Sequence, residues 1–491
     1  VDVTNSLPGM SIVGLPDNAV SEARERVHSA IKNSGYTFPT GKVIVNLAPA
    51  DIRKEGTNYD LPIAVGILKE QGIDIPDDNN TAFLGELSLD GNLRKVNGIL
   101  PLVSGLKENG ITTVFVPEEN AREAALVKDM VILGVKHLAD IAGHYTENPI
   151  KPTVIDINEY LARNANTDFS HDFKDVKGQV KAKKALEIAA AGGHNILMSG
   201  SPGSGKTLMA KCLASILPPL ELKEALELTK IYSVSGLLSP DEPLMTKRPY
   251  RSVHHTASSN SIIGGGSNPK PGEITLAHRG VLFLDEMTEF KPEILEGLRQ
   301  PLEDKDITIV RMGRTYTYPA DFMLVGAMNP CKCGYYPDRS RCNCSEQDIK
   351  RYIGKISMPL WDRFDMCIKT DEIGYEQIRC SSDNGNVPDS ESMKQAVMRA
   401  RFAQLKRFNG MNIKYNSQMS TGDMKRFCRL GEEEEKLIKR IFAKKRLTAR
   451  GYSKILKTAR TIADIDGNVN ITTANISEAF YYRGIPEVTI H

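Results

Sequence analysis

Eight consecutive residues carry the clearest chemistry in the sequence. They satisfy the pattern G-x-x-x-x-G-K-T, in which glycines let backbone N–H groups curl around phosphate groups. The apolar run 195–199 before them predicts a buried strand, and 208–216 after them predicts a helix whose N-terminus would meet the phosphates. This arrangement predicts a site for a nucleoside triphosphate such as ATP. The eight residues are Gly200, Ser201, Pro202, Gly203, Ser204, Gly205, Lys206 and Thr207.

Charged residues further along the chain would complete this site. Lys206 would reach the β- and γ-phosphates, and Thr207 would bind Mg²⁺. The apolar run 281–284 predicts a strand that ends in two carboxylates, Asp285 and Glu286. Asp285 would support the Mg²⁺, and Glu286 would polarise the attacking water.

A polar residue follows a third predicted strand, and two arginines lie beyond it. Residues 322–328 end in Asn329, whose amide would orient the same water or the γ-phosphate. These elements, in this order, resemble the AAA+ ATPases. The resemblance implies that Asn329 is sensor 1, Arg363 a trans-acting arginine finger and Arg450 sensor 2, and hence a ring, usually a hexamer. The alternatives are a structural ion pair of Arg363 with a flanking aspartate, and an ordinary basic-face residue at Arg450.

Four cysteines follow Asn329 in the pattern C-x-C-x₈-C-x-C. Four thiolates can close a tetrahedral zinc site and staple a loop that has little core of its own. Because C-x-C is tighter than the common C-x₂-C spacing, free thiols remain an alternative, and a redox role is a third. The four zinc-ligand candidates are Cys331, Cys333, Cys342 and Cys344.

The long gap between Thr207 and Asp285 leaves room for an insert. It contains His254-His255 and a glycine-rich run, 264–272. It resembles the magnesium-chelatase-like branch of AAA+ proteins, in which an insert interrupts the second helix. We expect the two histidines to face the nucleotide or a pore, and a metal pair is the alternative.

Residues 307–318 predict a β-hairpin with Gly313 at its turn. Its place just before Asn329 matches the pre-sensor hairpin of the same branch, which points into the pore of the ring. Arg311 and Arg314 at its tip are therefore candidates for contacts with DNA phosphates. The alternative is a hairpin that only faces solvent.

The N-terminal region contains stretches that resemble the proteolytic domain of Lon. Residues 85–98 match a strand-and-turn segment, 109–120 match the next strand, and 54–60 fall where Lon carries its nucleophile. Active Lon uses a serine activated by a lysine. By this alignment the serine position is Asn58, and no lysine occurs near 100–102.

An amide cannot act as a nucleophile, and a leucine cannot act as a base. We therefore expect the Lon-like domain to be proteolytically inactive. Thr57 is a possible substitute nucleophile, but the sequence shows no evident base for it.

Positive charge is concentrated near the C-terminus of the 491-residue chain, although the whole chain carries only +2. Residues 1–168 hold 15 Lys+Arg against 23 Asp+Glu, whereas residues 391–460 hold 19 against 6, a net charge of +13. Charge this concentrated favours a polyanionic partner such as nucleic acid. Solvated helix faces are the alternative.

Composition excludes several classes of protein. Hydrophobic residues make up 41% and charged residues 25%, values that exclude a fibrous or a largely disordered chain. No apolar run reaches about 18 residues, so we expect no membrane span and a cytoplasmic location. Eight cysteines without a secretion signal favour metal ligation or buried thiols over disulfides. Because the chain begins at Val1, we expect residues upstream of it.

The predicted fold class is α/β, in three domains joined by two linkers. Residues 1–150 predict a Lon-protease-like α+β domain, and 151–172 a linker. Residues 173–370 predict an AAA+ parallel-sheet core that carries the insert, the hairpin and the cysteine-rich loop. Residues 371–392 predict a second linker, and 393–491 a basic helical lid with almost no strand signal.

This order of domains resembles the ComM/YifB family over essentially the whole chain. Three stretches carry the resemblance most specifically, namely 13–17, 46–51 and 54–62. The resemblance implies a hexameric helicase that uses ATP and Mg²⁺ to drive branch migration of incoming DNA during bacterial natural transformation. Single-stranded or branched DNA is the expected partner, and the residues before Val1 would form the family's first strand.

Three other functions are weighed against this DNA motor. A chelatase-type motor that remodels a protein partner for metal insertion shares the ATPase residues, but it would need an integrin-like domain that this chain lacks. An ATP-dependent protease would need the absent Ser–Lys pair. A non-catalytic DNA-binding scaffold would be expected to have a degenerate nucleotide site, and every element of the site is intact.

Overall fold

The structure is a computed structural model, and its chain divides into two compact units. One unit is Val1–Arg163 with Glu221–Thr246, and the other is Asn164–Leu220 with Lys247–His491. The segment Glu221–Thr246, which the sequence places between the two halves of the nucleotide site, therefore belongs with the N-terminal unit. The described residues are 1–76, 78–163, 170–266, 269–311, 314–372, 374, 388–445 and 447–483.

The N-terminal unit combines two small sheets and a hairpin with helices. In the first sheet β3 pairs antiparallel with β1 and parallel with β2, and in the second β7 pairs parallel with both β4 and β8. Its elements are β1 (Asp2–Thr4), β2 (Gly9–Val13), α1 (Asn18–Asn33), β3 (Lys42–Asn46), α2 (Asp60–Glu70), β4 (Thr81–Phe83), β5 (Glu86–Leu87), β6 (Leu93–Arg94), α3 (Ile99–Glu108), β7 (Thr113–Pro117), α4 (Glu118–Ala124), β8 (Val131–Val135), α5 (Leu138–His144), α6 (Ile157–Arg163) and α9 (Leu222–Ser235).

A buried ion pair ties α1 to α2 in this unit. The Arg26 guanidinium donates to both carboxylate oxygens of Asp60, at 2.7 and 3.0 Å, and Asp60 also accepts from the Leu87 N–H. Burial raises the pKa of Asp60. The Arg26 guanidinium and the Leu87 N–H lower it, but the effect of burial is larger. Asp60 is fully buried, so its carboxylate depends on these partners.

Helix α9 joins the N-terminal unit through its C-terminal turn. It packs against α3, the Ser233 carbonyl accepts from the Gly98 N–H at 3.1 Å, and the Ser233 hydroxyl donates to Glu123. Lys95 donates to the carbonyl of Leu238 at 2.6 Å. These contacts explain why a segment far along the chain clusters with the first domain.

The second unit is built on a five-stranded parallel sheet of order β10-β13-β16-β9-β17. Every residue of β9, β13 and β16 is buried, as expected for a parallel sheet that is covered on both faces. The elements up to its last strand are α7 (Val180–Gly192), β9 (Ile196–Ser199), α8 (Lys206–Ile216), β10 (Tyr250–Val253), α10 (Ser259–Ile263), β11 (Gly264–Gly265), β12 (Lys270–Pro271), α11 (Glu273–Leu276), β13 (Val281–Leu284), α12 (Pro292–Gly297), α13 (Arg299–Asp304), β14 (Asp306–Arg311), β15 (Arg314–Pro319), β16 (Met323–Met328), α14 (Glu346–Ile353), α15 (Met358–Trp361) and β17 (Met366–Lys369), with 3₁₀ turns at Phe173–Asp175 and Met287–Glu289.

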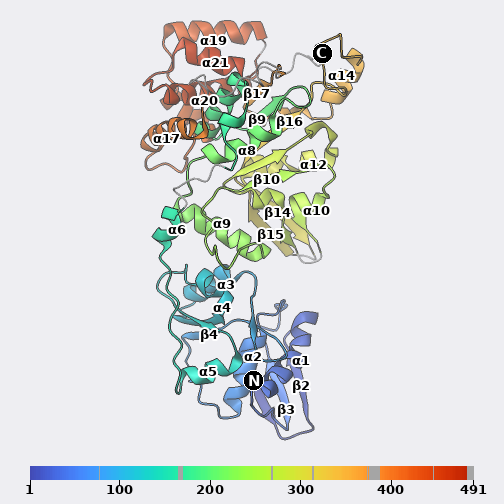
Figure 1. Cartoon of the computed structure of the whole chain (residues 1–491), viewed down its shortest axis with the longest axis vertical. Helices are drawn as coiled ribbons and strands as arrows, with labels where there is room; N and C mark the ends of the chain where they lie inside the picture. Colours follow the sequence, from blue (N-terminus) through green and yellow to red (C-terminus); the bar gives the residue numbers. More distant parts are fainter. Residues whose placement is uncertain are drawn as a thin grey trace. The chain divides into compact units, whose positions relative to one another are not determined.

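The C-terminal part of this unit is helical, and its described residues 388–445 and 447–483 contain no strand. It packs against α7, whose alanines are buried between the lid helices and the sheet. Figure 1 shows the orange-to-red helices α17, α19, α20 and α21 grouped together, and of these α17 and α20 contact α7. The helices are α17 (Ser390–Arg407), α18 (Thr421–Phe427), α19 (Glu432–Lys445), α20 (Ala449–Ile465) and α21 (Thr473–Tyr481), with a 3₁₀ turn at Asn416–Gln418.

No helix within the described part of the chain is long and apolar enough to cross a membrane. The longest described helix, α17, carries charged residues along most of its length.

Asp365, just before β17, links the sheet to the lid. Its carboxylate accepts from the Asn195 N–H at 3.0 Å and lies 3.4 Å from Lys454 Nζ of α20 and 3.7 Å from His194 Nδ1. Burial opposes charge on Asp365, but Lys454, His194 and the Asn195 N–H outweigh it and hold the pKa of this carboxyl well below its ordinary range.

We expect Asp365→Asn to lower the free energy of unfolding by about 3–5 kcal/mol near neutral pH, because it leaves the Lys454 ammonium without its anion. The folded pKa is depressed, so this stabilisation is present above the unfolded pKa of about 3.9 and is lost as the pH falls through and below it. Thermal unfolding of both proteins should therefore differ most near neutral pH and converge on acidification. Asp129→Asn, in an exposed pair with Lys107, is the control and should change little. A pH-independent gap would contradict this account.

Candidate nucleotide site

The Lys206 amine lies inside the phosphate-binding loop between β9 and α8. Its Nζ donates to the carbonyls of Gly200 at 2.8 Å and Ser201 at 2.9 Å, and lies 3.4 Å from Ser204 Oγ and from Asn329 Oδ1. All four acceptors are neutral oxygens. Burial lowers the pKa of Lys206 to about 8.

The chain reaches this geometry because glycines permit backbone angles that other residues avoid. Gly203 and Gly205 have φ angles of +77° and +83°, in the left-handed region that a Cβ disfavours. Gly205 is the N-cap of α8, so the helix begins at Lys206 with its N–H groups directed toward the loop.

Thr207, in the first turn of α8 after β9, and Asp285, just after β13, meet at the carboxyl edge of the sheet, where β16 lies between those two strands. The Thr207 hydroxyl donates to Asp285 Oδ2 at 2.7 Å. A hydroxyl beside a carboxylate is the oxygen pair that Mg²⁺ requires in a phosphate-binding loop. The residues therefore fit a magnesium-bound triphosphate, because Lys206 is a buried cation with only neutral hydrogen-bond acceptors and a Mg²⁺ ligand pair lies next to it.

Glu286 has a histidine neighbour that the sequence did not single out as its partner. His255 Nδ1 lies 3.3 Å from Glu286 Oε2, and the His254 and His255 rings lie with centroids 4.1 Å apart at an interplanar angle of 33°. Glu286 has a φ of +49°, a left-handed conformation rare for a non-glycine residue and typical of functional positions. Because β10 pairs with β13, His255 just beyond β10 comes beside the carboxylate just beyond β13.

Gln179 is a second residue that motif analysis missed. Its side-chain amide donates to the Ser204 carbonyl at 3.1 Å and to the Asp371 carbonyl at 2.6 Å, and its carbonyl accepts from the Asp371 N–H. It thus fastens the phosphate-binding loop to the segment after β17. The only sequence signal is the preceding Gly178, which allows the turn before α7.

The two predicted arginines lie together near Asp362 and away from the Lys206 contacts. Arg363 Nη2 pairs with Glu303 Oε1 at 2.7 Å, and the Arg363 side chain is only 13% exposed. Arg450, at the start of α20 as predicted, is 61% exposed and lies 3.9 Å from Asp362 Oδ2. Among the described residues, neither arginine forms a hydrogen bond or an ion pair with the residues around Lys206.

The expected hairpin forms as β14 and β15, with Arg311 opposite Arg314 in its register. Arg314 is exposed. The backbone of Arg311 is described, but its side chain, like residues 312–313 with the predicted turn glycine, lies outside the described residues. Ile307 and Ile309 on β14 are buried, so one face of the hairpin is anchored in the protein.

The lid presents less free positive charge than its composition suggests. Arg401 and Arg460 are 5% and 3% exposed, and both Arg460 and Arg407 pair with Asp464. Lys454 binds Asp365. Three of the exposed lid cations, Lys436, Lys439 and Arg450, also lie within 4 Å of a carboxylate. The exposed cations in the described part of the lid are Arg399, Lys406, Lys425, Arg426, Arg429, Lys436, Lys439, Arg440 and Arg450.

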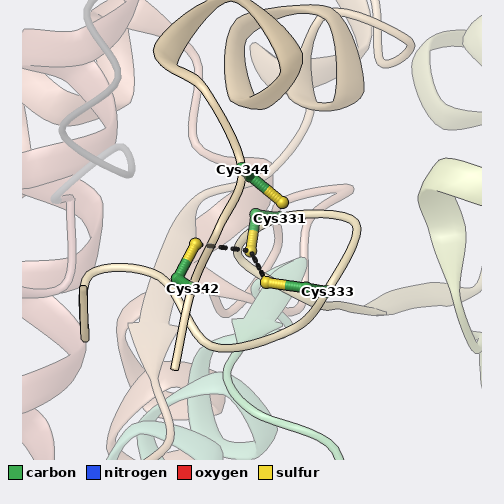
Figure 2. Close-up of side chains that lie close together, drawn as sticks. All are labelled: Cys331, Cys333, Cys342 and Cys344. Atoms are coloured by element: carbon green, nitrogen blue, oxygen red, sulfur yellow. Dashed lines mark hydrogen bonds between the residues drawn. The ribbon is translucent and has the colours of Figure 1, made fainter. Parts of the chain in front are cut away.

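The four cysteines after Asn329 converge. Figure 2 shows the Cys331 sulfur between those of Cys333 and Cys342, with Cys344 beside them. The four sulfur atoms all lie within 4.8 Å of one another, which is a possible metal site. The backbone N–H of Tyr335 lowers the pKa of the Cys333 thiol to about 6.

In the segment predicted to resemble Lon, the structure shows which contacts the polar side chains make. The Thr57 hydroxyl donates to Glu86 Oε2 at 2.6 Å, a carboxylate partner that the sequence did not reveal. Buried Lys54 donates to the Pro49 carbonyl, and the Asn58 carbonyl accepts from the Gly85 N–H at 3.3 Å. Lys54 therefore serves the backbone, and the absence of protease activity stays a prediction.

Comparisons with known proteins agree along the whole chain. Residues 1–120 match the family described as subunit ChlI of Mg-chelatase, and residues 172–378 match the family of magnesium chelatase, subunit ChlI. Residues 388–483 match the C-terminal family of the same subunit. The 38 kDa magnesium-chelatase subunit of Rhodobacter capsulatus is 27% identical over 34% of this chain and 53% of its own length.

Two relatives match over nearly their full length. The uncharacterized protein YifB of Escherichia coli is 40% identical over 100% of this chain and 94% of its own. The competence protein ComM of Haemophilus influenzae is 37% identical over 99% of this chain and 94% of its own. A nucleotide site of AAA+ type and this similarity identify the chain as a member of the ComM/YifB family of magnesium-chelatase-like AAA+ ATPases.

Proposed function

We propose that this protein is a homohexameric ATP-driven motor that translocates along DNA and promotes branch migration during natural transformation and recombination. The observation that carries the proposal is the intact nucleotide site, in which Lys206, Thr207, Asp285 and Asn329 converge within one chain. A scaffold without catalysis would not need this set.

Each residue has a role that its position allows. Lys206 neutralises phosphate charge, and Thr207 with Asp285 holds the Mg²⁺, which supplies charge neutralisation when it is bound. Glu286 accepts a proton from the attacking water, and His255 orients its carboxylate. Asn329, whose side-chain oxygen lies next to the Lys206 amine, orients the attacking water or the γ-phosphate.

In the proposed ring, Arg363 acts on the nucleotide of a neighbouring subunit. As an arginine finger it has to leave Glu303 of its own chain and face the phosphates of a neighbouring subunit. The arginine exchanges the Glu303 carboxylate for phosphates, which carry more negative charge. Ring assembly with bound nucleotide therefore favours the exchange. Arg450 then acts as sensor 2 from the lid.

DNA is proposed as the substrate on three grounds. The lid keeps a set of exposed cations, Arg314 is exposed at the end of a hairpin strand, and one relative carries the name competence protein. Cations on separate exposed elements suit a phosphate backbone better than a compact anion. Single-stranded or branched DNA in the cytoplasm is the expected substrate.

A chelatase-type motor that remodels a protein partner for metal insertion is the second candidate. The partial identity to a 38 kDa magnesium-chelatase subunit favours it. Such a motor would use the same Lys206 site, but its ATP hydrolysis would not depend on DNA.

The steady-state ATPase rate should rise when DNA is added, and the rise should shrink at higher salt, because cations that bind phosphate release counterions. The rate is measured without DNA and with single strands, duplex and a four-way junction, at two salt concentrations. Lys206→Ala should abolish turnover under every condition. An ATPase rate that no DNA changes would favour the protein-remodelling motor instead. DNA-dependent ATP hydrolysis by pure Lys206→Ala protein would refute the assigned nucleotide site.

His255→Ala should lower kcat by about 10- to 100-fold and leave nucleotide affinity nearly unchanged, because it removes the partner that orients Glu286. His254→Ala is the comparison variant: the His254 side chain hydrogen-bonds Thr256 at 2.9 Å and its ring lies against that of His255, so this substitution should lower kcat less than His255→Ala does. In a Glu286→Gln background, His255→Ala should have no further effect on kcat. Additive losses in the double variant would show that His255 acts elsewhere.

Arg314→Ala should weaken DNA binding and reduce the slope of log K against log salt by about 0.7, the value for one lost phosphate contact on a single strand. Binding is measured by fluorescence anisotropy with a labelled single strand. Arg24→Ala, an exposed arginine of the net-negative N-terminal unit, is the control and should leave the slope unchanged. An unchanged slope for Arg314→Ala would show that Arg314 of the hairpin does not contact DNA phosphates.

A further inference from the structure

We propose that Cys331, Cys333, Cys342 and Cys344 bind one zinc ion, and that the loop they close braces the phosphate-binding loop through Gly334 and Pro202. Metal loading of this loop would then set how well the chain holds nucleotide. The zinc site stands on its own geometry, whereas the effect on nucleotide rests on the proposed ATPase function.

The sulfur positions fit a tetrahedral centre. Zinc–sulfur bonds of about 2.3 Å place thiolates about 3.8 Å apart in a tetrahedron. The Cys331 sulfur lies 3.7 Å from that of Cys342 and 3.3 Å from that of Cys333, and all four lie within 4.8 Å of one another. A disulfide would need about 2.05 Å. Four soft thiolates in this arrangement select zinc over the oxygen-preferring cations.

The surroundings suit a centre that carries negative charge. Four thiolates and a divalent cation leave a net charge of −2, and the loop supplies three cations against one carboxylate, Asp338. The Tyr336 N–H points to the Cys331 sulfur at 3.4 Å, as expected for a donor to a metal-bound thiolate. The three cations are Lys332, Arg339 and Arg341.

The loop is held in place from both sides. Cys331 and Cys342 are buried in the same apolar cluster as Trp361 and Phe364. On the outer side the Arg341 guanidinium stacks over Tyr335 at 4.0 Å and pairs with Glu372 at 2.7 Å. A fourteen-residue loop without a helix or strand of its own gains its rigidity from such cross-links.

Gly334 connects this loop to the nucleotide site. It adopts a φ of +89°, and a Cβ at this position would lie 2.6 Å from Pro202 Cδ in the phosphate-binding loop. Two residues before Cys331, Asn329 Oδ1 lies 3.4 Å from Lys206 Nζ. A loop whose thiolates are no longer joined would lose its hold on both Pro202 and Asn329.

The first arm of the test measures metal on the purified full chain. Wild type should contain about one zinc per chain, and Cys333→Ser should lose it. Cys428→Ser is the matched control, because Cys428 is a buried cysteine of the lid that faces the Leu456 carbonyl. Cobalt added to zinc-stripped wild type should give the absorption bands of a tetrahedral four-thiolate site. The metal site would be overturned if wild type contained no zinc and gave no such bands with cobalt. A disulfide in wild type would overturn it as well.

The second arm measures affinity for a fluorescent ATP analogue. Zinc-stripped wild type and Cys333→Ser should bind it about 3- to 30-fold more weakly than loaded wild type, and re-adding zinc should restore only the former. Gly334→Ala should keep its zinc and still bind the analogue more weakly, which separates the brace from metal loss and from misfolding. Unchanged affinity in stripped protein, or in zinc-loaded Gly334→Ala, would overturn the brace. Wild type that binds zinc but no nucleotide would instead overturn the proposed ATPase function.

Discussion

The buried ammonium of Lys206 is the interaction on which the nucleotide site depends. A cation removed from water destabilises the protein unless an anion compensates it, and here its hydrogen-bond acceptors are neutral oxygens. Burial therefore lowers its pKa even though Asp285 and Glu286 act in the opposite direction. A triphosphate supplies the missing negative charge. The parallel sheet creates this environment because β9, β13 and β16 all end at the same edge, so each contributes its next residues to one place.

The residues around Lys206 were predictable because their positions follow from local rules. A glycine-rich loop between a strand and a helix has essentially one geometry, and a polar residue directly after a buried parallel strand lies at the carboxyl edge of the sheet. Asn329 therefore lies against the Lys206 amine, and Thr207 meets Asp285, as these rules predict. The strands, the helix after the loop and the helical C-terminal region were predictable for the same reason, since apolar runs and helical periodicity are local signals.

The features that the sequence did not reveal are pairings over long distances along the chain. Gln179 binds the segment after β17, and His255 meets Glu286 only because β10 lies next to β13. The net charge of +13 suggested more exposed cations in the lid than the structure shows. A count of residues cannot reveal that Arg460 is buried in an ion pair with Asp464. The transfer of Glu221–Thr246 to the N-terminal unit depends on contacts such as that of Ser233 with Glu123, which no local pattern encodes.

The turn that carries Arg363 shows how the proposed ring can couple its subunits. Arg483 and Arg450 lie 3.7 and 3.9 Å from Asp362, and Lys454 binds Asp365. Arg363 therefore stands between two aspartates that are both held by the lid. A lid that shifts when its own subunit changes nucleotide state must move this turn, since breaking the Asp365 contacts would strand a buried charge. In the proposed ring, the position of Arg363 would therefore depend on the nucleotide state of the subunit that supplies it.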